Sequence, residues 1–184
     1  DVPQLPKDVA ERIAEFVASG GGLLIAPGAK ILPEFYNGWT WRGESVAPLP
    51  LKTFATERWT RRRPSLDPAT FSGRTVRNLQ TQNDLKRAIV AGWWSLDATE
   101  QPQRVEGAMT TGDPFLAVRR LGRGTVAMTA FPLDASLSNL PSLQSFLPLV
   151  HEIAYALANP TTAELNLDPS PSPVLMLSPG GLLA

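Results

Sequence analysis

The sequence has 184 residues, which is enough for one domain with a sizeable core. Its 17 basic and 17 acidic side chains balance, so the chain carries no net charge that would attract nucleic acid or an acidic membrane surface. It contains no cysteine, which excludes a thiol nucleophile, a thiolate metal site and disulfide bonds.

The first part of the chain predicts a helix followed by a strand. An apolar stripe at helical spacing predicts a helix over 6–19, formed by Val9, Ile13, Phe16 and Val17. Gly20 suits the residue after the last helical turn. The run 23–26 is wholly apolar, which is typical of a parallel strand covered on both faces. Pro27-Gly28 then ends this strand in a loop.

The middle of the chain is rich in proline and is expected to be irregular. Residues 30–41 are predicted to form a loop with one helical turn near Pro33, and 42–83 an insertion punctuated by prolines. Asp67 is expected to cap a short helical turn within that insertion. We expect a strand over 88–96, although Asp84 could instead cap a helix there.

The later part of the chain predicts an antiparallel meander and a closing helix. Three strand-like runs, separated by glycine turns, cover 104–110, 114–121 and 125–131. The third run is apolar on both sides, so we expect it to be central in the sheet. A helix is predicted over 145–158, and Asn159-Pro160 ends it.

Several short motifs occur in a recognisable order along the chain. They are Gly20-Gly21-Gly22-Leu23-Leu24, Gly112-Asp113-Pro114-Phe115, Gly122-Arg123-Gly124-Thr125-Val126, Phe131-Pro132-Leu133-Asp134, Ser138-Asn139-Leu140-Pro141 and Phe146-Leu147-Pro148-Leu149-Val150-His151-Glu152. This pattern resembles the class I glutamine amidotransferase-like domain of large membrane-anchored proteins in planctomycete-type bacteria. Those proteins look like BatA-type aerotolerance regulators, often carry a von Willebrand factor A domain, and have ThuA-like relatives.

The resemblance implies an α/β fold of the flavodoxin-like type. It implies a sandwich with a central mixed sheet, helices on both faces and an antiparallel meander. The amidotransferase-like domain would cover 1–160, with the insertion at about 42–83, and would begin just after an early strand. Residues 161–184 read as a proline-rich linker or the start of a following region, which is expected to contact the domain through 174–177.

The resemblance also bears on activity. Active amidotransferases carry a cysteine on a tight turn after one strand and a His-Pro-Glu after a later strand. Here the first position falls near Ala26-Pro27-Gly28, and Phe131 stands in place of the histidine. We therefore expect a non-catalytic module that serves binding or assembly, with no catalytic residue, cofactor or metal.

A candidate ligand crevice lies beyond the predicted strand ends, where open α/β sheets bind ligands. Its residues are Gly28, Asn37, Asp134, Ser138 and Asn139. One alternative function is a small-molecule or carbohydrate binding domain that uses this crevice with tryptophan walls. Equally, Asp134 and Asn139 could simply hydrogen-bond the loop backbone.

A second alternative is a degenerate serine hydrolase that uses Ser138 with His151 and Asp134. No G-x-S-x-G turn presents this serine, however, and a single histidine beside the apolar stripe of a helix is usually a packed or capping residue.

The expected partners are other domains of the parent, another protein or a small molecule, and not nucleic acid. The one basic run, 58–63, reads as a solvated loop. The sequence has no apolar run near the length of a membrane span, so membrane association would come only through anchor segments outside it. By resemblance, the domain would lie on the extracytoplasmic side of a membrane-associated parent.

Overall fold

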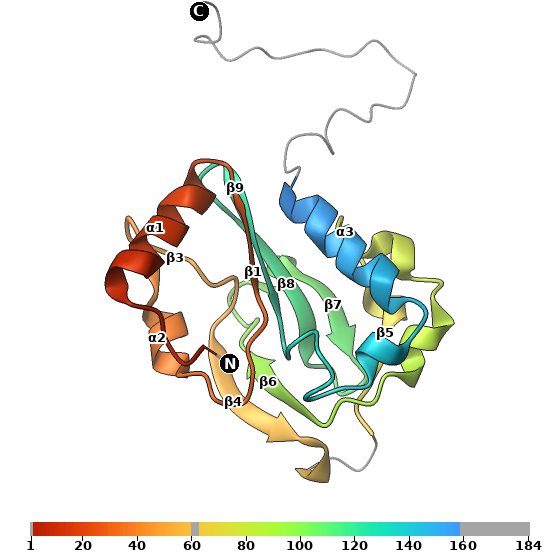
Figure 1. Ribbon diagram of the computed structural model, residues 1–184. Helices are drawn as coiled ribbons and strands as arrows, with labels where there is room; N and C mark the ends of the chain where they lie inside the picture. Colours follow the sequence, from red (N-terminus) through yellow and green to blue (C-terminus); the bar gives the residue numbers. More distant parts are fainter. Residues whose placement is uncertain (1, 60–62, 159–184) are drawn as a thin grey trace, which may run out of the picture.

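The computed structural model describes residues 2–59 and 63–158, which form a mixed α/β fold around one central sheet (Figure 1). The sheet has five strands in the order β1-β9-β8-β7-β5. In that order they are Gly22–Ile25, Gly124–Thr129, Pro114–Leu121, Val105–Met109 and Leu66–Asp67. β1 runs parallel to β9, and all other neighbours are antiparallel. The predicted meander and the parallel pairing are therefore confirmed.

Two helices cover this sheet, α1 (Lys7–Ala18) and α3 (Phe146–Ala158), and Figure 1 shows them on either side of β1 and β9. α1 turns its small or apolar residues Ala10, Ala14 and Val17 inward, whereas α3 buries Leu149 and Ile153. Both helices match their predicted spans to within a residue, because apolar stripes mark them, and Pro6 and Gly20 also flank the ends of α1.

Glycine permits the close approach of α1 to the sheet. A Cβ atom on Gly124 of β9 would lie 2.0 Å from the carbonyl oxygen of Val17 and 2.2 Å from that of Gly21. Real Cβ atoms do not come that close to backbone, so only glycine fits here. Gly122-Arg123-Gly124 therefore has a role beyond the hairpin turn, because Gly124 also lets α1 pack closely against the sheet.

The proline-rich middle of the chain builds two short two-stranded sheets beside the main sheet. We call these two small sheets the second layer. β4 (Leu51–Thr56) pairs antiparallel with β6 (Gly92–Leu96), and β2 (Thr40–Trp41) pairs with β3 (Glu44–Ser45). The short helix α2 (Pro33–Gly38) begins at the predicted helical turn. Residues 42–83 therefore contain several short strands and 3-10 helices rather than one long loop.

The predictions for this middle region differ in their outcome. Asp67 does cap a 3-10 helix at Pro68–Thr70, because its carboxylate accepts the N–H of Ala69 at 3.2 Å. The strand predicted over 88–96 is shorter and begins at Gly92, because Ile89 and Val90 pair instead with Asn139 and Ser138. The expectation that the strand after Gly21 is covered on both faces is wrong for the described chain, because Leu24 is 36% exposed.

One apolar core joins the two layers. Phe71, Phe115 and Phe131 are fully buried. The ring centroid of Phe115 lies 6.3 Å from that of Phe71 and 5.3 Å from that of Phe131. Every residue of β9 is buried, so this strand is central, as predicted. The predicted tail contact through 174–177 and part of the basic run 58–63 lie outside the described residues. Among the helices that are described, none is long and apolar enough to cross a membrane.

Candidate functional site

The predicted crevice residues are placed mostly in local hydrogen bonds. Asn139 and Ile89 are joined by two hydrogen bonds. The backbone N–H of Asn139 donates to the Ile89 carbonyl at 3.2 Å, and the side-chain Oδ1 of Asn139 accepts the Ile89 N–H at 2.7 Å. Ser138 is buried and its Oγ accepts the N–H of Leu140 at 3.3 Å. Asp134 accepts the N–H of Ser136 at 2.8 Å and also its hydroxyl group. These hydrogen bonds from Ser136 lower the pKa of Asp134 below its ordinary value.

Asn37 and Gly28 make contacts of a different kind. The side chain of Asn37 donates to the Leu51 carbonyl at 2.9 Å and accepts the Leu51 N–H at 2.8 Å, so it fastens α2 to β4. The carbonyl of Gly28 accepts the indole N–H of Trp94 at 2.9 Å. The structure thus keeps Ser138 and Asn139 together beside Ile89, while Asn37 serves a separate junction.

Tryptophan side chains fill space beside the predicted crevice. Trp94 is 6% exposed, and its ring packs edge-on against Phe54 at 5.5 Å between centroids. Trp93 and Trp39 are also buried. These three rings are therefore core residues, and they do not stand as open walls of a sugar site.

The three residues named for a serine hydrolase each have a different partner. His151 lies on the exposed side of α3, where its ring stacks on Tyr155 at 6.3 Å. The oxygen atoms of Ser138 and Asp134 accept hydrogen bonds from their own loop. No hydrogen bond among the described residues joins the three side chains. Within the same residues, no group of three or more His, Cys, Asp or Glu could hold a metal ion.

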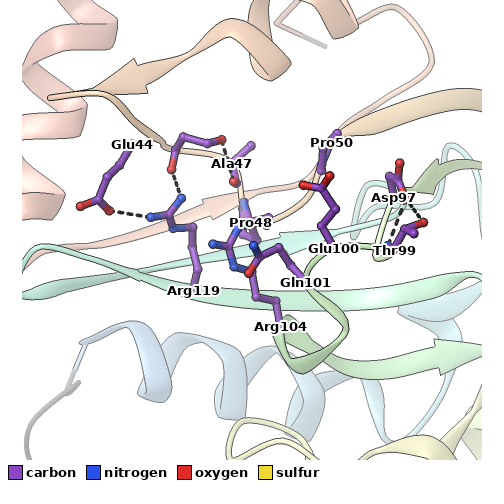
Figure 2. Close-up of a pocket in the computed structure, with 11 residues that line it drawn as sticks. Glu44, Ala47, Pro48, Pro50, Asp97, Thr99, Glu100, Gln101, Arg104 and Arg119 are labelled. Atoms are coloured by element: carbon purple, nitrogen blue, oxygen red, sulfur yellow. Dashed lines mark hydrogen bonds and ion pairs between the residues drawn. The ribbon is translucent and has the colours of Figure 1, made fainter.

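A polar hollow lies between the start of the insertion and the sheet, on the sheet face opposite α3. It has a volume of about 560 Å³ and is lined by β8, the β3–β4 segment and the short 3-10 helix Pro102–Arg104 (Figure 2). We call it the arginine hollow, because Arg104 and Arg119 lie side by side in it. Val118, the neighbour of Arg119 in β8, lines instead the hollow that faces α3.

Arg119 is held firmly in this hollow. Its side chain is only 9% exposed. One guanidinium nitrogen donates to Glu44 at 2.8 Å and another to the carbonyl of Ser45. Burial lowers the pKa of Arg119, and the neighbouring charge of Arg104 lowers it further, while Glu44 acts in the opposite direction. A lowered pKa means that burial and the nearby Arg104 make the positive charge of Arg119 less favourable there than in water.

Arg104 is held from the opposite side. Its Nη1 donates to the carbonyl of Pro48 at 2.7 Å. Among the described residues, the ion pairs of the hollow involve Arg119 and Asp97 but not Arg104. A guanidinium has five N–H donors in a planar fork, so a single carbonyl leaves most of them free for a ligand.

The acidic rim of the hollow is already compensated in part. Asp97 accepts hydrogen bonds from Thr99, and Lys52 lies 2.9 Å from its carboxylate. Those two neighbours, Thr99 first, lower the pKa of Asp97 to about 2. Glu100 completes the rim (Figure 2). The hollow therefore places two closely spaced arginines on its floor and a mixture of charges around its mouth.

The sequence contained one signal for this hollow. Arg119 and Arg120 interrupt the otherwise apolar run Pro114–Leu121, and in a strand only one of two neighbours can face the same side. Arg120 is exposed on the side of α3, which leaves Arg119 on the opposite, covered face. Arg104 carried no comparable signal, because only the fold brings it beside Arg119.

Comparison with known proteins gives a fold and no function. No family model matches the sequence, and no curated protein matches it. Among solved structures, it is similar to "Cytoplasmic Protein STM3548 from Salmonella typhimurium", with a TM-score of 0.64 and 16% identity over 84% of this chain. A second similar structure is "Cytoplasmic Protein STM1381 from Salmonella typhimurium LT2", with a TM-score of 0.57 and 18% identity over 84% of this chain. The chain covers 62% of the length of each, so what it shares with them is a mixed α/β fold.

Proposed function

We propose that this chain is a non-catalytic, amidotransferase-like module of the flavodoxin-like type, which serves binding within a larger, membrane-anchored bacterial protein on its extracytoplasmic side. The motif order and the absence of any cysteine motivate the first part of this proposal. The parallel pairing of β1 with β9 and the α/β layering agree with it. The ligand site of the module is the arginine hollow, and its ligand is a small molecule that carries a carboxylate.

The observation that carries this assignment is the placement of Arg104 beside the buried Arg119. Two guanidinium groups repel one another, and the hollow holds them in place through the carbonyls of Pro48 and Ser45. Glu44 neutralises one of the two charges, but its own side chain is 64% exposed and lies at the mouth. Among the described residues, Glu44 pairs with Arg119 and Lys52 pairs with Asp97, and Glu100 lies on the rim, so the lining is not positive as a whole. The guanidinium of Arg104 is the group on the floor that a bidentate carboxylate would match.

The size of the hollow fits a small ligand. Its volume of about 560 Å³ lies within the range of small-molecule sites, roughly 300–1,000 Å³. Gln101 and Thr99 add neutral polar groups that could orient the rest of the ligand. An acidic carbohydrate is the second candidate, because its carboxylate would match the arginines, whereas Trp39, Trp93 and Trp94 are buried and offer no open aromatic face.

Calorimetric titration with dicarboxylates such as succinate and glutarate tests this function, with the matching diamides as neutral probes. We expect carboxylates to bind and diamides not to bind. Arg104→Ala should weaken binding at least tenfold, about 1.4 kcal/mol. The matched control Arg120→Ala removes an exposed arginine on the opposite face and should leave binding unchanged. Equal binding of acids and amides, or equal loss in both variants, would refute the site.

The non-catalytic part of the proposal has its own test. A glutaminase or hydrolase assay should show no turnover with the purified domain. Turnover that disappears in a variant of Asp134 or His151 would overturn the proposal and would favour the hydrolase alternative.

A further inference from the structure

A free strand edge and an apolar trough lie side by side at one end of the sheet. β1 pairs with β9 along one edge, and its other edge has no strand partner among the described residues. Beside that edge is a trough of about 490 Å³, which we call the β1 trough. Its lining is almost entirely apolar and consists of Phe16, Gly22, Leu24, Leu133, Val150, Ile153, Ala154, Leu157 and Ala158.

Two large apolar side chains of the β1 trough are open to solvent. Phe16 of α1 is 59% exposed and Leu24 of β1 is 36% exposed, and both line the β1 trough. An unpaired edge with apolar neighbours on both faces is a template for one more strand. Such a strand would be covered by α1 on one face and by α3 on the other, so its side chains would need to be apolar in both directions.

The tail of this chain supplies a segment with that property. Residues 174–177 read Val-Leu-Met-Leu, with no polar alternation, and Pro173 and Pro179 flank them. Proline cannot donate to a strand ladder, so it limits the pairing segment to about the four residues of β1. This is the pattern expected of a strand that is buried on both faces.

The tail is also tethered at the right place. It continues from Ala158, the last residue of α3, and Ala158 itself lines the β1 trough. Fifteen residues, 159–173, separate it from Val174. Extended, they span at most about 50 Å, whereas four strand residues extend only about 13 Å. Either strand direction is therefore within reach, and tethering gives the segment a high effective concentration at the trough.

From these observations we propose that Val174–Leu177 adds to the free edge of β1 as a sixth strand and fills the β1 trough. The strand would close the sheet on the side where Leu24 is exposed and would hold the tail against the domain. This inference does not depend on the arginine hollow, which lies elsewhere on the fold.

Disulfide formation tests this inference without background, because the chain has no cysteine of its own. Leu24→Cys is combined, one at a time, with cysteine at 174, 175, 176 and 177, and oxidation is followed by non-reducing gel electrophoresis. Side chains alternate along a strand, so we expect alternate positions, either 174 and 176 or 175 and 177, to form intramolecular disulfides faster than the other two. Leu182→Cys, on the same tail, is the control for random collision.

Each other result has a clear meaning. Equal rates at all four positions and at 182 would overturn the proposal in favour of a loose tail. Disulfide-linked dimers in place of monomers would assign the trough to a second copy of this chain and would also overturn it. As an independent measurement, Leu175→Asp with Leu177→Asp should speed amide hydrogen exchange in β1 at least tenfold, and unchanged exchange would contradict strand addition.

Discussion

Asp113 joins the two layers of the fold, and its removal should cost more stability than its position in a turn suggests. Its carboxylate accepts the indole N–H of Trp93 at 2.9 Å, the hydroxyl of Ser95 at 3.1 Å and the hydroxyl of Thr111 at 2.9 Å. Trp93 and Ser95 belong to β6, whereas Asp113 lies between β7 and β8. One side chain therefore fastens the β4–β6 pair to the central meander.

The expected cost of Asp113→Ala follows from these contacts. Trp93 is only 2% exposed, so its N–H would be left buried without a partner, at a cost of about 1–3 kcal/mol. The two hydroxyl bonds contribute about 1 kcal/mol each at most, and water can replace part of them because Asp113 is half-buried. The sum is a loss of about 3 kcal/mol in the free energy of unfolding, or roughly 6–12 °C in Tm for a chain of this size.

Urea unfolding followed by tryptophan fluorescence measures this change, with Asp134→Ala as the matched control. Asp134 also accepts hydrogen bonds in a turn, but its partner is the exposed Ser136 of the same loop. We expect its removal to cost less than about 1 kcal/mol. A loss at Asp113 within about 0.5 kcal/mol of wild type, or equal losses in the two variants, would refute the view that this carboxylate joins the layers.

The remaining predictions concern backbone fit and acid titration. Gly124→Ala should destabilise the domain by more than about 3 kcal/mol in the same unfolding assay, because its Cβ would meet backbone carbonyls of the α1 region. The control Gly38→Ala should change the free energy of unfolding by less than about 1 kcal/mol, because a Cβ at Gly38 would meet no other atom. Equal effects at the two glycines would contradict the close approach. Asp97 should titrate with a pKa of about 2 by NMR, and Thr99→Ala should raise that pKa. Since the folded pKa lies below the ordinary value of 3.8, Asp97 favours the folded state above about pH 4, and this contribution disappears as the pH falls through 2. A pKa near 3.8 for Asp97 in the wild-type protein would contradict the view that Thr99 and Lys52 stabilise its carboxylate.

The parts of the fold that the sequence predicts well are those with local signals. The α1 stripe, the Asp67 cap and the glycine turns of the meander are each set by neighbours within a few residues, so they are found close to where the pattern puts them. The strand over 88–96 is predicted too long because Ala88, Ile89 and Val90 are apolar, yet Ile89 and Val90 pair with the distant Asn139 and Ser138.

The candidate site is harder to predict because it has no local signal. Arg104 and Arg119 are fifteen positions apart, and they meet only because β7 folds back on β8. Topology places Gly28 and Asp134 just beyond strand ends, but Trp94 of β6 occupies the place beside Gly28. Long-range pairing of an insertion is set by tertiary packing, which a single sequence does not reveal.

The burial of Trp94 has a consequence for any ligand that approaches the loop at Gly28. The indole occupies this place and donates its N–H to the Gly28 carbonyl, with Phe54 against its ring. A molecule could enter only after the ring swings out, so a site there would exist in a minor, opened population of the protein. The same ring would report that opening, because its fluorescence shifts to longer wavelength when the indole meets water.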